Sequence, residues 1–480
     1  MKKLIHNATI VDSSSKVFEG SLLIDGDKIK EVRAGSLPID SDIDETIDAS
    51  GRIVIPGMVN AHYHSYSNVL KGTTNNLPLE IWSLYTVAYG HSLTEEELEL
   101  AVLLGAIEMI KNGTTACIDH YPHLVGSNAA LKAYEKTGMR IGFAPMMHDV
   151  PDHHFLNVKL PNYFKKKLDD APRKSVGEVD DYYRGLIEAW HNKNGNIEIM
   201  LGPNAPQRCS SDMLNLCREL SEEFGLAVHT HLLETKGQLI SGVETFPDGI
   251  FGHLKEHGLL SEKLSVAHAV ILKNNEIELL RGHGVTVVHN PASNMTLGSG
   301  KAPIHHFLNE TSKLAIGTDA SNCGTQHNLF EAMRLAAMWH RVDEPDYQKW
   351  PQSVDVWRMA TAGGAGVFSN DSVLGRITEG AAADLVFLKA TGTSFTPLQD
   401  PVTQLVFQEN GRSVDSVMVA GEWVMKDGSL TTLNEREILE EVRERTEHLM
   451  SHSKQQVELA DQLAPYFKQR YDELQRENYN

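Results

Sequence analysis

The feature that most constrains the fold of this 480-residue chain is a regular alternation of short apolar runs with amphipathic segments. Apolar runs separated by helices are typical of β/α units and of a parallel sheet. Helical patterns occur at 94–111, 179–191, 211–224 and 274–281. Eight apolar runs occur, at 53–59, 114–118, 140–146, 196–201, 226–229, 264–267, 285–288 and 313–316. Eight strands with intervening helices predict an α/β protein with a (β/α)8 barrel of the TIM-like type.

Both ends of the chain have a different sequence pattern from this central part. Residues 1–56 read as short strands between turn signals, and a similar pattern returns between 383 and 424. We therefore expect a small β-sandwich built from both chain ends, 1–56 plus 368–430, beside a barrel at 57–367. Residues 431–480 are charged and helix-prone, which predicts a C-terminal helical extension that packs on the rest.

Polar side chains suited to metal binding or proton transfer follow almost every apolar run. In a (β/α)8 barrel the carboxyl ends of all strands meet at one rim, where catalytic residues lie. Any one residue is weak evidence, because a histidine can be a satisfied core residue and an aspartate can cap a turn. Their joint placement predicts a metal site at the rim. The residues are His62, His64, Asp119, His120, Asn204, Gln207, His229, His231, Glu234, His268, His289, Asn290 and Asp319.

The first of these groups is the pair His62 and His64 in VNAHYHS. Residues i and i+2 of a strand point to the same face, so both imidazoles are expected to leave the strand end together. Two imidazoles that face one way are half of a metal site, although an isolated His-x-His can also mark the polar end of a strand.

Five motifs, PGMVNAHYH, HTHLLET, VAHAVIL, HNPASNMTLGSG and IGTDAS, resemble the amidohydrolase superfamily. The most similar branch holds triazine hydrolases, guanine-type deaminases and methylthioadenosine/adenosylhomocysteine deaminases. The resemblance implies that Glu234 shuttles protons, that His268 orients the attacking water or the substrate, and that His229 is a supporting residue. It implies four metal ligands, which are His62, His64, His231 and Asp319.

Three imidazoles and one carboxylate suit one divalent cation, with Zn2+ expected first and Fe2+ as the alternative. The cation would lower the pKa of a bound water until hydroxide forms near neutral pH. No lysine ends the fourth run, where other branches of the family carry a carbamylated lysine between two metals, so we predict a mononuclear site. In the predicted reaction, metal-bound hydroxide attacks a carbon that bears an amine. Glu234 then passes a proton to the adjacent ring nitrogen, His268 steadies the developing charge, and Asp319 takes the proton of the attacking oxygen.

This chemistry predicts a metal-dependent aminohydrolase, a hydrolase of carbon–nitrogen bonds other than peptide bonds, that releases ammonia from a small nitrogen heterocycle. The same site could instead expel chloride or an alkylamine, or hydrolyse an imino group, because hydroxide attacks whichever electrophilic carbon the pocket presents. A catalytically inactive barrel scaffold is the alternative from another class of protein. The scaffold predicts missing ligands, whereas every expected ligand is present.

Three departures from the family pattern bear on the substrate. His91 stands where nucleoside deaminases place a glutamate that grips the ribose, and Asn204 replaces the histidine of the usual Gly-Pro-His. The stretch MRIGFAPMMHD lacks the arginine expected for a carboxylate tail. We therefore expect a small, flat heterocycle or an amidine-like compound rather than an adenosylhomocysteine-type substrate. Segment 149–175 fits a lid over the site and a surface loop equally well. The expected substrate-binding residues are Trp82, His91, His120, Asn204, Gln207 and His289.

Charge and cysteine content narrow the partners of the chain. With 44 basic and 64 acidic side chains the formal net charge is −20, which argues against a nucleic-acid or anionic-membrane partner. Four widely spaced cysteines without a C-x-x-C predict free thiols, and no apolar run is long enough to span a bilayer. We expect a cytoplasmic enzyme that binds a small-molecule substrate, and the resemblance alone suggests a homodimer.

Overall fold

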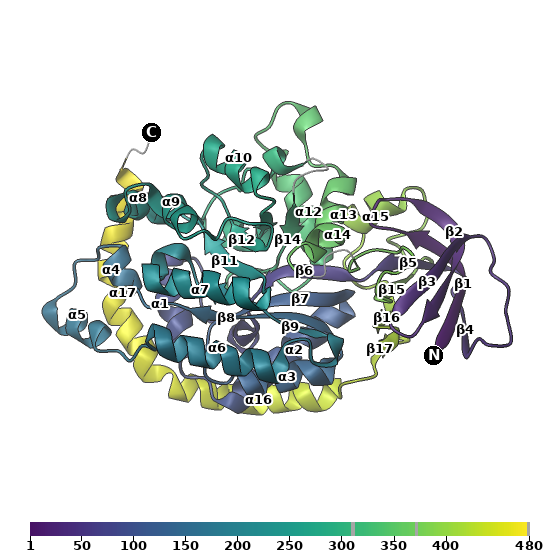
Figure 1. The fold of residues 1–480 in the computed structure, drawn as a ribbon, viewed down its shortest axis with the longest axis horizontal. Coiled ribbons are helices and arrows are strands. Elements are labelled where there is room, and N and C mark those ends of the chain that lie inside the picture. The colour runs from purple at the N-terminus through teal and green to yellow at the C-terminus, as the bar shows by residue number, and fades with distance from the viewer. Residues whose placement is uncertain (309–312, 370–372, 478–480) are drawn as a thin grey trace.

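The computed structural model describes residues 1–308, 313–369 and 373–477 of the chain. Two parallel sheets lie at the centre with helices around them, and a larger mixed sheet lies at the end that holds the N-terminus (Figure 1). Two long C-terminal helices run along the outside (Figure 1). Among the described residues, no helix has both the length and the apolar character needed to cross a membrane.

The two parallel sheets contain the strands that the apolar runs predict. One has five strands, in the order β10-β8-β7-β6 with β9 paired to β8, and the other has four, in the order β11-β12-β13-β14. Single bridges join the sheets, from Leu201 to Val228 and from Tyr63 to Asp319. This arrangement is compatible with a (β/α)8 barrel. The strands are β6 (Met58–Tyr63), β7 (Thr114–Tyr121), β8 (Arg140–Met147), β9 (Ile197–Ile199), β10 (Gly202–Pro203), β11 (Val228–Leu232), β12 (Leu264–His268), β13 (Thr286–His289) and β14 (Leu314–Ile316).

The first apolar run, 53–59, is not one strand, which corrects the prediction. Its beginning belongs to β5 (Arg52–Pro56) in the mixed sheet, and its end belongs to β6 in a parallel sheet. Gly57 lies where the chain passes between the sheets, and a Cβ there would stand 2.1 Å from Thr115 Oγ1. The sequence pattern does not show the break, because both strands are buried and apolar on either side of it.

Small apolar side chains fill the space between the parallel strands. Ala116 and Ile118 of β7 belong to a buried cluster shared with β6, β8, β13 and β14. Cys117, which lies between them in the chain, belongs instead to the larger core under the helices. Alternation along a strand therefore directs residues 116, 118 and 120 to the interior, with His120 at the carboxyl end of the series.

Helices occupy the four segments for which the sequence predicts them, as α2, α6, α7 and α10. The predicted capping signal is present, since Glu97 N–H donates to Thr94 Oγ1 and Thr94 N–H donates to Glu97 Oε2. The helices before the C-terminal pair are α1 (Leu79–Gly90), α2 (Glu95–Lys111), α3 (Ser127–Thr137), α4 (Asp152–Phe155), α5 (Asn162–Asp169), α6 (Val176–Trp190), α7 (Ser211–Phe224), α8 (Lys236–Thr245), α9 (Gly249–Glu256), α10 (Asn274–Gly282), α11 (Pro291–Thr296), α12 (Leu329–Trp339), α13 (Ser353–Ala360), α14 (Ala362–Ala365) and α15 (Pro401–Phe407).

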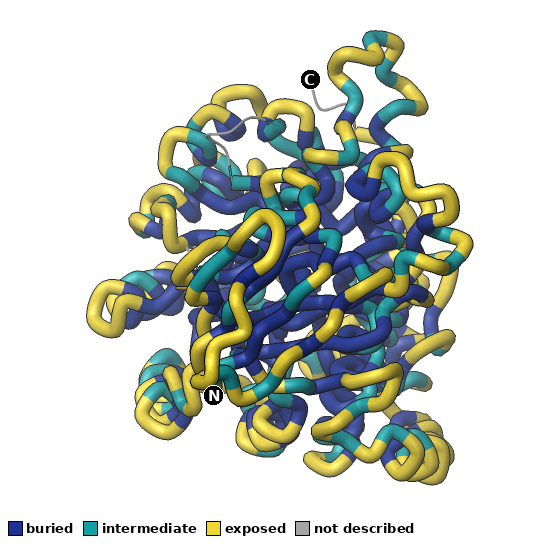
Figure 2. Tube along the Cα trace, turned by 90° about the vertical axis from the view of Figure 1, so that its right-hand side faces the viewer, coloured by how far each residue is buried: buried dark blue, intermediate teal, exposed yellow. Residues whose placement is uncertain are grey.

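The mixed sheet unites strands from both ends of the chain. Its order is β18-β17-β16-β15-β5-β1-β2-β3, with β4 paired to β1, and β15 runs antiparallel to β5. A bridge from Lys28 to Ala382 links β3 to the segment before β15. Buried strands lie under exposed loops when the molecule is seen from this end (Figure 2). The remaining strands are β1 (Lys2–Val11), β2 (Val17–Asp25), β3 (Lys28–Ala34), β4 (Glu45–Asp48), β15 (Leu385–Lys389), β16 (Val414–Val419), β17 (Glu422–Lys426) and β18 (Ser429–Leu430).

The C-terminal residues form α16 (Glu435–His452) and α17 (Lys454–Arg476), which pack against the central part. Lys111 of α2 pairs with Glu435 at 2.6 Å. Arg470 of α17 donates to the carbonyl oxygen of Leu156 at 2.7 Å, which ties this helix to segment 149–175. That segment contains α4 and α5, and its role as a lid stays a prediction.

Candidate metal centre and active site

His62 and His64 reach the interior because β6 contains a bulge. Between the pairings of Asn60 and Tyr63, β6 holds one residue more than β7. The bulge reverses the alternation, so that Tyr63 packs in the core under the helices while the two histidines face the interior. Both histidines are buried, and their ring centroids lie 4.7 Å apart.

His64 and His231 each present Nε2, because a backbone carbonyl holds Nδ1. His64 Nδ1 lies 2.6 Å from the carbonyl oxygen of His120, and His231 Nδ1 lies 2.5 Å from that of Asn204. A carbonyl oxygen can only accept a hydrogen bond, so both Nδ1 atoms carry the proton. In the neutral form of each ring, Nε2 then carries the lone pair through which imidazole binds a metal.

His62 reaches the same state through a relay of side chains. Its Nδ1 lies 2.7 Å from His229 Nε2, and His229 Nδ1 lies 2.7 Å from Ser265 Oγ. The Ser265 hydroxyl donates to the carbonyl oxygen of Val228, so it accepts from His229. The proton of His62 is therefore on Nδ1, and its buried Nε2 has no hydrogen-bond partner among the described residues. In this way His229 fixes the tautomer of His62, and its supporting role beside a metal ligand stays a prediction.

Asp319 follows β14 and brings a carboxylate to the three Nε2 atoms. Its Oδ1 lies 3.2 Å from His64 Nε2 and 3.5 Å from His62 Nε2, and the Nε2 atoms of His64 and His231 are 3.4 Å apart. Ser293 Oγ donates to Oδ2 at 2.5 Å. Burial works against ionisation, but the neighbouring imidazoles hold the pKa of Asp319 well below its usual value.

The spacing of these donors matches a small divalent cation. Zn2+ binds imidazole nitrogen and carboxylate oxygen at about 2.0–2.2 Å, which in a tetrahedron puts neighbouring donors roughly 3.3 Å apart. Three donor pairs of this centre, His64 with Asp319, His62 with Asp319 and His64 with His231, lie 3.2–3.5 Å apart. Without a cation or a proton between them, lone pairs and a carboxylate at these distances repel each other, so the donor set fits the predicted metal.

Glu234 and His268 stand beside the donors. His268 Nε2 lies 3.7 Å from Glu234 Oε2 and 3.6 Å from Asp319 Oδ2, and Asn294 Oδ1 lies 2.9 Å from His268 Nδ1. Burial raises the pKa of Glu234 from 4.5 to about 7. A carboxyl group that titrates near neutral pH can both take and give a proton, as a general acid–base requires.

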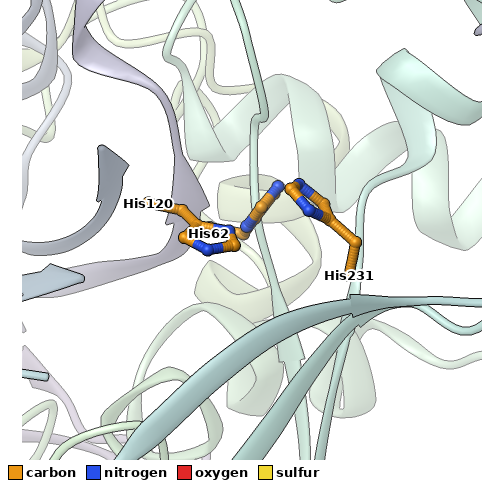
Figure 3. Close-up of side chains that lie close together, drawn as sticks. All are labelled: His62, His120 and His231. Carbon is orange, nitrogen blue, oxygen red and sulfur yellow. The ribbon is translucent and has the colours of Figure 1, made fainter. Parts of the chain in front are cut away.

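His120 lies in the same cluster, although the sequence analysis assigns it to the rim and to the substrate pocket and not to the four metal ligands. Ring nitrogens of His62, His120 and His231 lie within 4.8 Å of one another. Figure 3 shows the three side chains pointing toward one another. The His120 ring is fully buried, and neither of its nitrogens has a hydrogen-bond partner among the described residues.

Asn204 and Gln207, both predicted pocket residues, follow β10 in the chain. The carbonyl group of Asn204 orients His231, while its side-chain amide lies 2.8 Å from Met146 Sδ. Gln207 is buried, and its Oε1 has no hydrogen-bond partner among the described residues. A buried acceptor without a partner among the described residues is available to a donor of a bound molecule.

The other three predicted pocket residues have partners of their own. Trp82 donates to the carbonyl oxygen of Asn322 at 3.1 Å, in the loop that follows Asp319. His91 is exposed, and its ring centroid lies 5.6 Å from that of His123. His289 Nε2 lies 3.3 Å from His340 Nε2. Contact of these residues with a substrate stays a prediction.

Several supporting residues were not singled out from the sequence. Ser293 and Asn294, which hold Asp319 and His268, stand in the motif HNPASNMTLGSG, so the motif itself offered the signal. His327 is different, because its ring bonds to Thr318 and Asn68 at 2.8 Å inside a buried polar network. No motif marks it.

The sequence comparisons agree with this geometry. Residues 53–424 match the Amidohydrolase family. A 5'-deoxyadenosine deaminase of Methanobrevibacter smithii is 31% identical over 454 residues, which are 94% of this chain and 99% of that protein. A 5-methylthioadenosine/S-adenosylhomocysteine deaminase of Syntrophomonas wolfei is 30% identical over 461 residues, 94% of this chain and 100% of that protein. The branch that the motifs resemble is thereby confirmed.

Solved structures share the fold. An adenosine deaminase from Xanthomonas campestris with bound zinc has a TM-score of 0.84 at 23% identity, covering 94% of this chain and 98% of that one. Atrazine chlorohydrolase from Arthrobacter aurescens complexed with zinc also has a TM-score of 0.84 at 23% identity, covering 92% and 100%. With its matching profile, full-length relatives and shared architecture, the chain belongs to the amidohydrolase family.

Proposed function

We propose that this chain is a metal-dependent aminohydrolase that replaces an amino group on a nitrogen heterocycle by hydroxyl and releases ammonia. One observation carries the proposal: three Nε2 lone pairs and the Asp319 carboxylate meet beside a buried glutamate whose pKa is about 7. The curated relatives are named as deaminases, which are hydrolases of carbon–nitrogen bonds other than peptide bonds.

The residues that would hold the metal are His62, His64, His231 and Asp319. Three nitrogens and one oxygen favour Zn2+, with Fe2+ as the alternative, over oxygen-preferring Mg2+ or Ca2+. A bound cation of this kind supplies Lewis acidity, which makes hydroxide available from water near neutral pH.

The residues around the metal ligands carry the protons. Glu234 accepts a proton from the attacking water and delivers it to the ring nitrogen next to the amino group, which its near-neutral pKa permits. His268, turned toward both Glu234 and Asp319, steadies the negative charge that develops as the carbon becomes tetrahedral. Asp319 takes the remaining proton of the attacking oxygen, and protonation of the amino group lets ammonia leave.

The substrate proposal rests on a comparison with the relatives. Their names specify 5'-deoxyadenosine, methylthioadenosine and adenosylhomocysteine, so a 6-aminopurine is the first candidate ring. In this chain His91 and Asn204 replace the side chains expected to hold the sugar. We therefore propose an amino heterocycle with a small substituent, contacted by Asn204 and Gln207, with Trp82, His91 and His289 as further predicted contacts.

The test is ammonia release by purified, zinc-supplemented protein. The panel holds 5'-deoxyadenosine, methylthioadenosine, free aminopurines, aminopyrimidines, aminotriazines and formimino compounds, and Asp319→Asn serves as the blank. Release from one ring class, absent in the blank and reduced about 10²–10⁴-fold in Glu234→Gln, is the expected result. Silence across the panel with metal bound would move the function to chloride, alkylamine or amide substrates. Silence without metal binding would favour an inactive scaffold.

We also propose how the architecture serves this site. The two parallel sheets close into one (β/α)8 barrel at 57–367, which the bridges from Leu201 to Val228 and from Tyr63 to Asp319 support. Residues 1–56 plus 368–430 form a small β-sandwich, and 431–480 a helical extension. The second bridge ends on Asp319, so barrel closure and ligand placement depend on the same contact.

A further inference from the structure

His120 is the one member of the histidine cluster for which the proposed reaction has no role. It lies in β7, where the alternation that buries Ala116 and Ile118 directs its side chain to the interior. Its carbonyl oxygen orients His64, so the backbone of His120 already serves the centre. Its imidazole lies among the ligands, with ring centroids 4.7 Å from His231 and 6.0 Å from His62.

The imidazole of His120 is buried without the hydrogen bonds that would compensate for its burial. A buried polar atom that lacks a partner destabilises the fold, and neither ring nitrogen of His120 has a partner among the described residues. A neutral imidazole has one N–H and one lone pair, so the ring of His120 offers one donor atom to a cation.

The lone pairs decide how many cations this region can hold. Two groups of possible ligands are present, His62 with His64 and Asp319, and His62 with His120 and His231. Both groups require His62, whose Nδ1 carries a proton held by His229. His62 thus has a single lone pair, on Nε2, and an imidazole nitrogen binds one cation at a time. The two groups are therefore parts of one centre.

We propose that His120 is a fifth protein ligand of that single cation, beside His62, His64, His231 and Asp319. This inference rests on the proposed metal-dependent function and deepens its metal site. A fourth imidazole makes the centre richer in nitrogen and favours Zn2+, Fe2+ or Co2+ further over oxygen-preferring cations. It also places one more fixed side chain against the position where water and substrate meet, which restricts the substrate on the side of β7.

Metal binding by the purified full-length protein tests the inference. Apoprotein is titrated with Co2+, and stoichiometry, affinity from chelator competition and the visible absorption of the bound ion are recorded for wild type, His120→Phe and His120→Gln. His123→Phe is the matched control, because His123 is a histidine after the same strand with an unpaired Nε2 but outside both ligand groups.

The expected result is one Co2+ per wild-type chain and at least ~10-fold weaker binding in His120→Phe. The absorption of the remaining ion should grow stronger, because Co2+ absorbs more strongly at lower coordination number. His120→Gln, which retains a donor atom, should lie between these two proteins, and His123→Phe should match wild type.

Three other results would overturn the inference. Unchanged affinity and spectrum in His120→Phe would place His120 against substrate or water, and metal loss in Asp319→Asn would show that the proposed function survives. Two Co2+ per wild-type chain, falling to one in His120→Phe, would establish a separate second site. No binding by wild type would remove the proposed function together with this inference.

Discussion

The two ends of the parallel strands differ in how far their polar groups are satisfied. At the amino end of β8, Arg140 donates from Nε to Asp384 Oδ2 at 2.7 Å and from Nη2 to Oδ1 at 3.1 Å. Asp384 also accepts from the backbone N–H of Ala420 in the mixed sheet. At the carboxyl ends, His62 Nε2 and both ring nitrogens of His120 are buried without a partner among the described residues.

This difference separates stability from function. A satisfied buried ion pair holds the mixed sheet against the parallel strands, whereas unsatisfied imidazoles raise the energy of the fold unless something binds them. Backbone strain follows the same division, since His268 and Asp319, at the carboxyl ends, have φ of +70° and +62°. Strain persists where surrounding contacts enforce it, and here it lies at two residues for which we propose catalytic roles.

The same change, aspartate to asparagine, should have different effects on metal binding at the two ends of the strands. Asp319→Asn removes a charged ligand, so we expect metal loss and a fall in kcat/KM of at least about 10³-fold, because Lewis-acid stabilisation is worth several kcal/mol. Asp384→Asn should leave the metal content of the folded protein unchanged. Metal analysis and steady-state kinetics on both variants check this, and equal metal loss in both would remove the distinction between the ends.

At the amino end, a substitution should lower the stability of the fold. Arg140→Ala leaves the Asp384 carboxylate buried without its partner, and we expect the free energy of unfolding to fall by about 3–5 kcal/mol. The matched control is Arg184→Ala, which breaks an exposed pair with Glu223 and should cost less than about 1 kcal/mol. Urea unfolding measures both. Equal stability of the two variants would show that the Arg140 pair does not join the sheets.

The raised pKa of Glu234 at the carboxyl end should make the stability of the metal-free protein depend on pH. Burial raises the pKa of Glu234 from 4.5 to about 7, so the folded state binds this proton more tightly than the unfolded chain. Its contribution is complete below pH 4.5 and is lost as the pH rises through 7, up to about 3 kcal/mol. Urea unfolding across this range should show wild type falling relative to Glu234→Gln. A constant difference would contradict the raised pKa.

The sequence predicts those parts of the site that depend on side chains at regular spacing along the chain. The proposed ligands His62, His64, His231 and Asp319 converge because strand alternation and β/α succession place strand ends together, and both leave periodic patterns in the sequence. The division of 53–59 between two sheets leaves no such pattern, since buried apolar residues continue on both sides of Gly57.

The finer organisation of the site depends on groups that carry no residue-type signal. Backbone carbonyls of His120 and Asn204 orient two of the ligands, and any residue could provide a carbonyl at these positions. Asn204 and His120 were predicted from their side chains, yet their main chains make the contacts that orient the metal site. The bulge in β6 likewise leaves no pattern in the sequence, because it depends on how β6 pairs with β7.

The hydrogen bonds from His62 to His229 and from His229 to Ser265 allow a further test of the difference between the two strand ends, with the smallest expected effect. His229 is buried and satisfied on both nitrogens, as the Arg140–Asp384 pair is at the amino end, yet it acts at the carboxyl end by keeping the proton of His62 on Nδ1. His229→Phe keeps the volume but removes the acceptor, so His62 can present either nitrogen, and we expect about 10–100-fold weaker metal binding. Ser265→Ala, one link further away, should have a smaller effect in the same direction. Chelator competition measures both affinities. Unchanged affinity in a folded His229→Phe would mean that burial alone orients His62, and satisfied polar groups would then serve only stability at both ends of the strands.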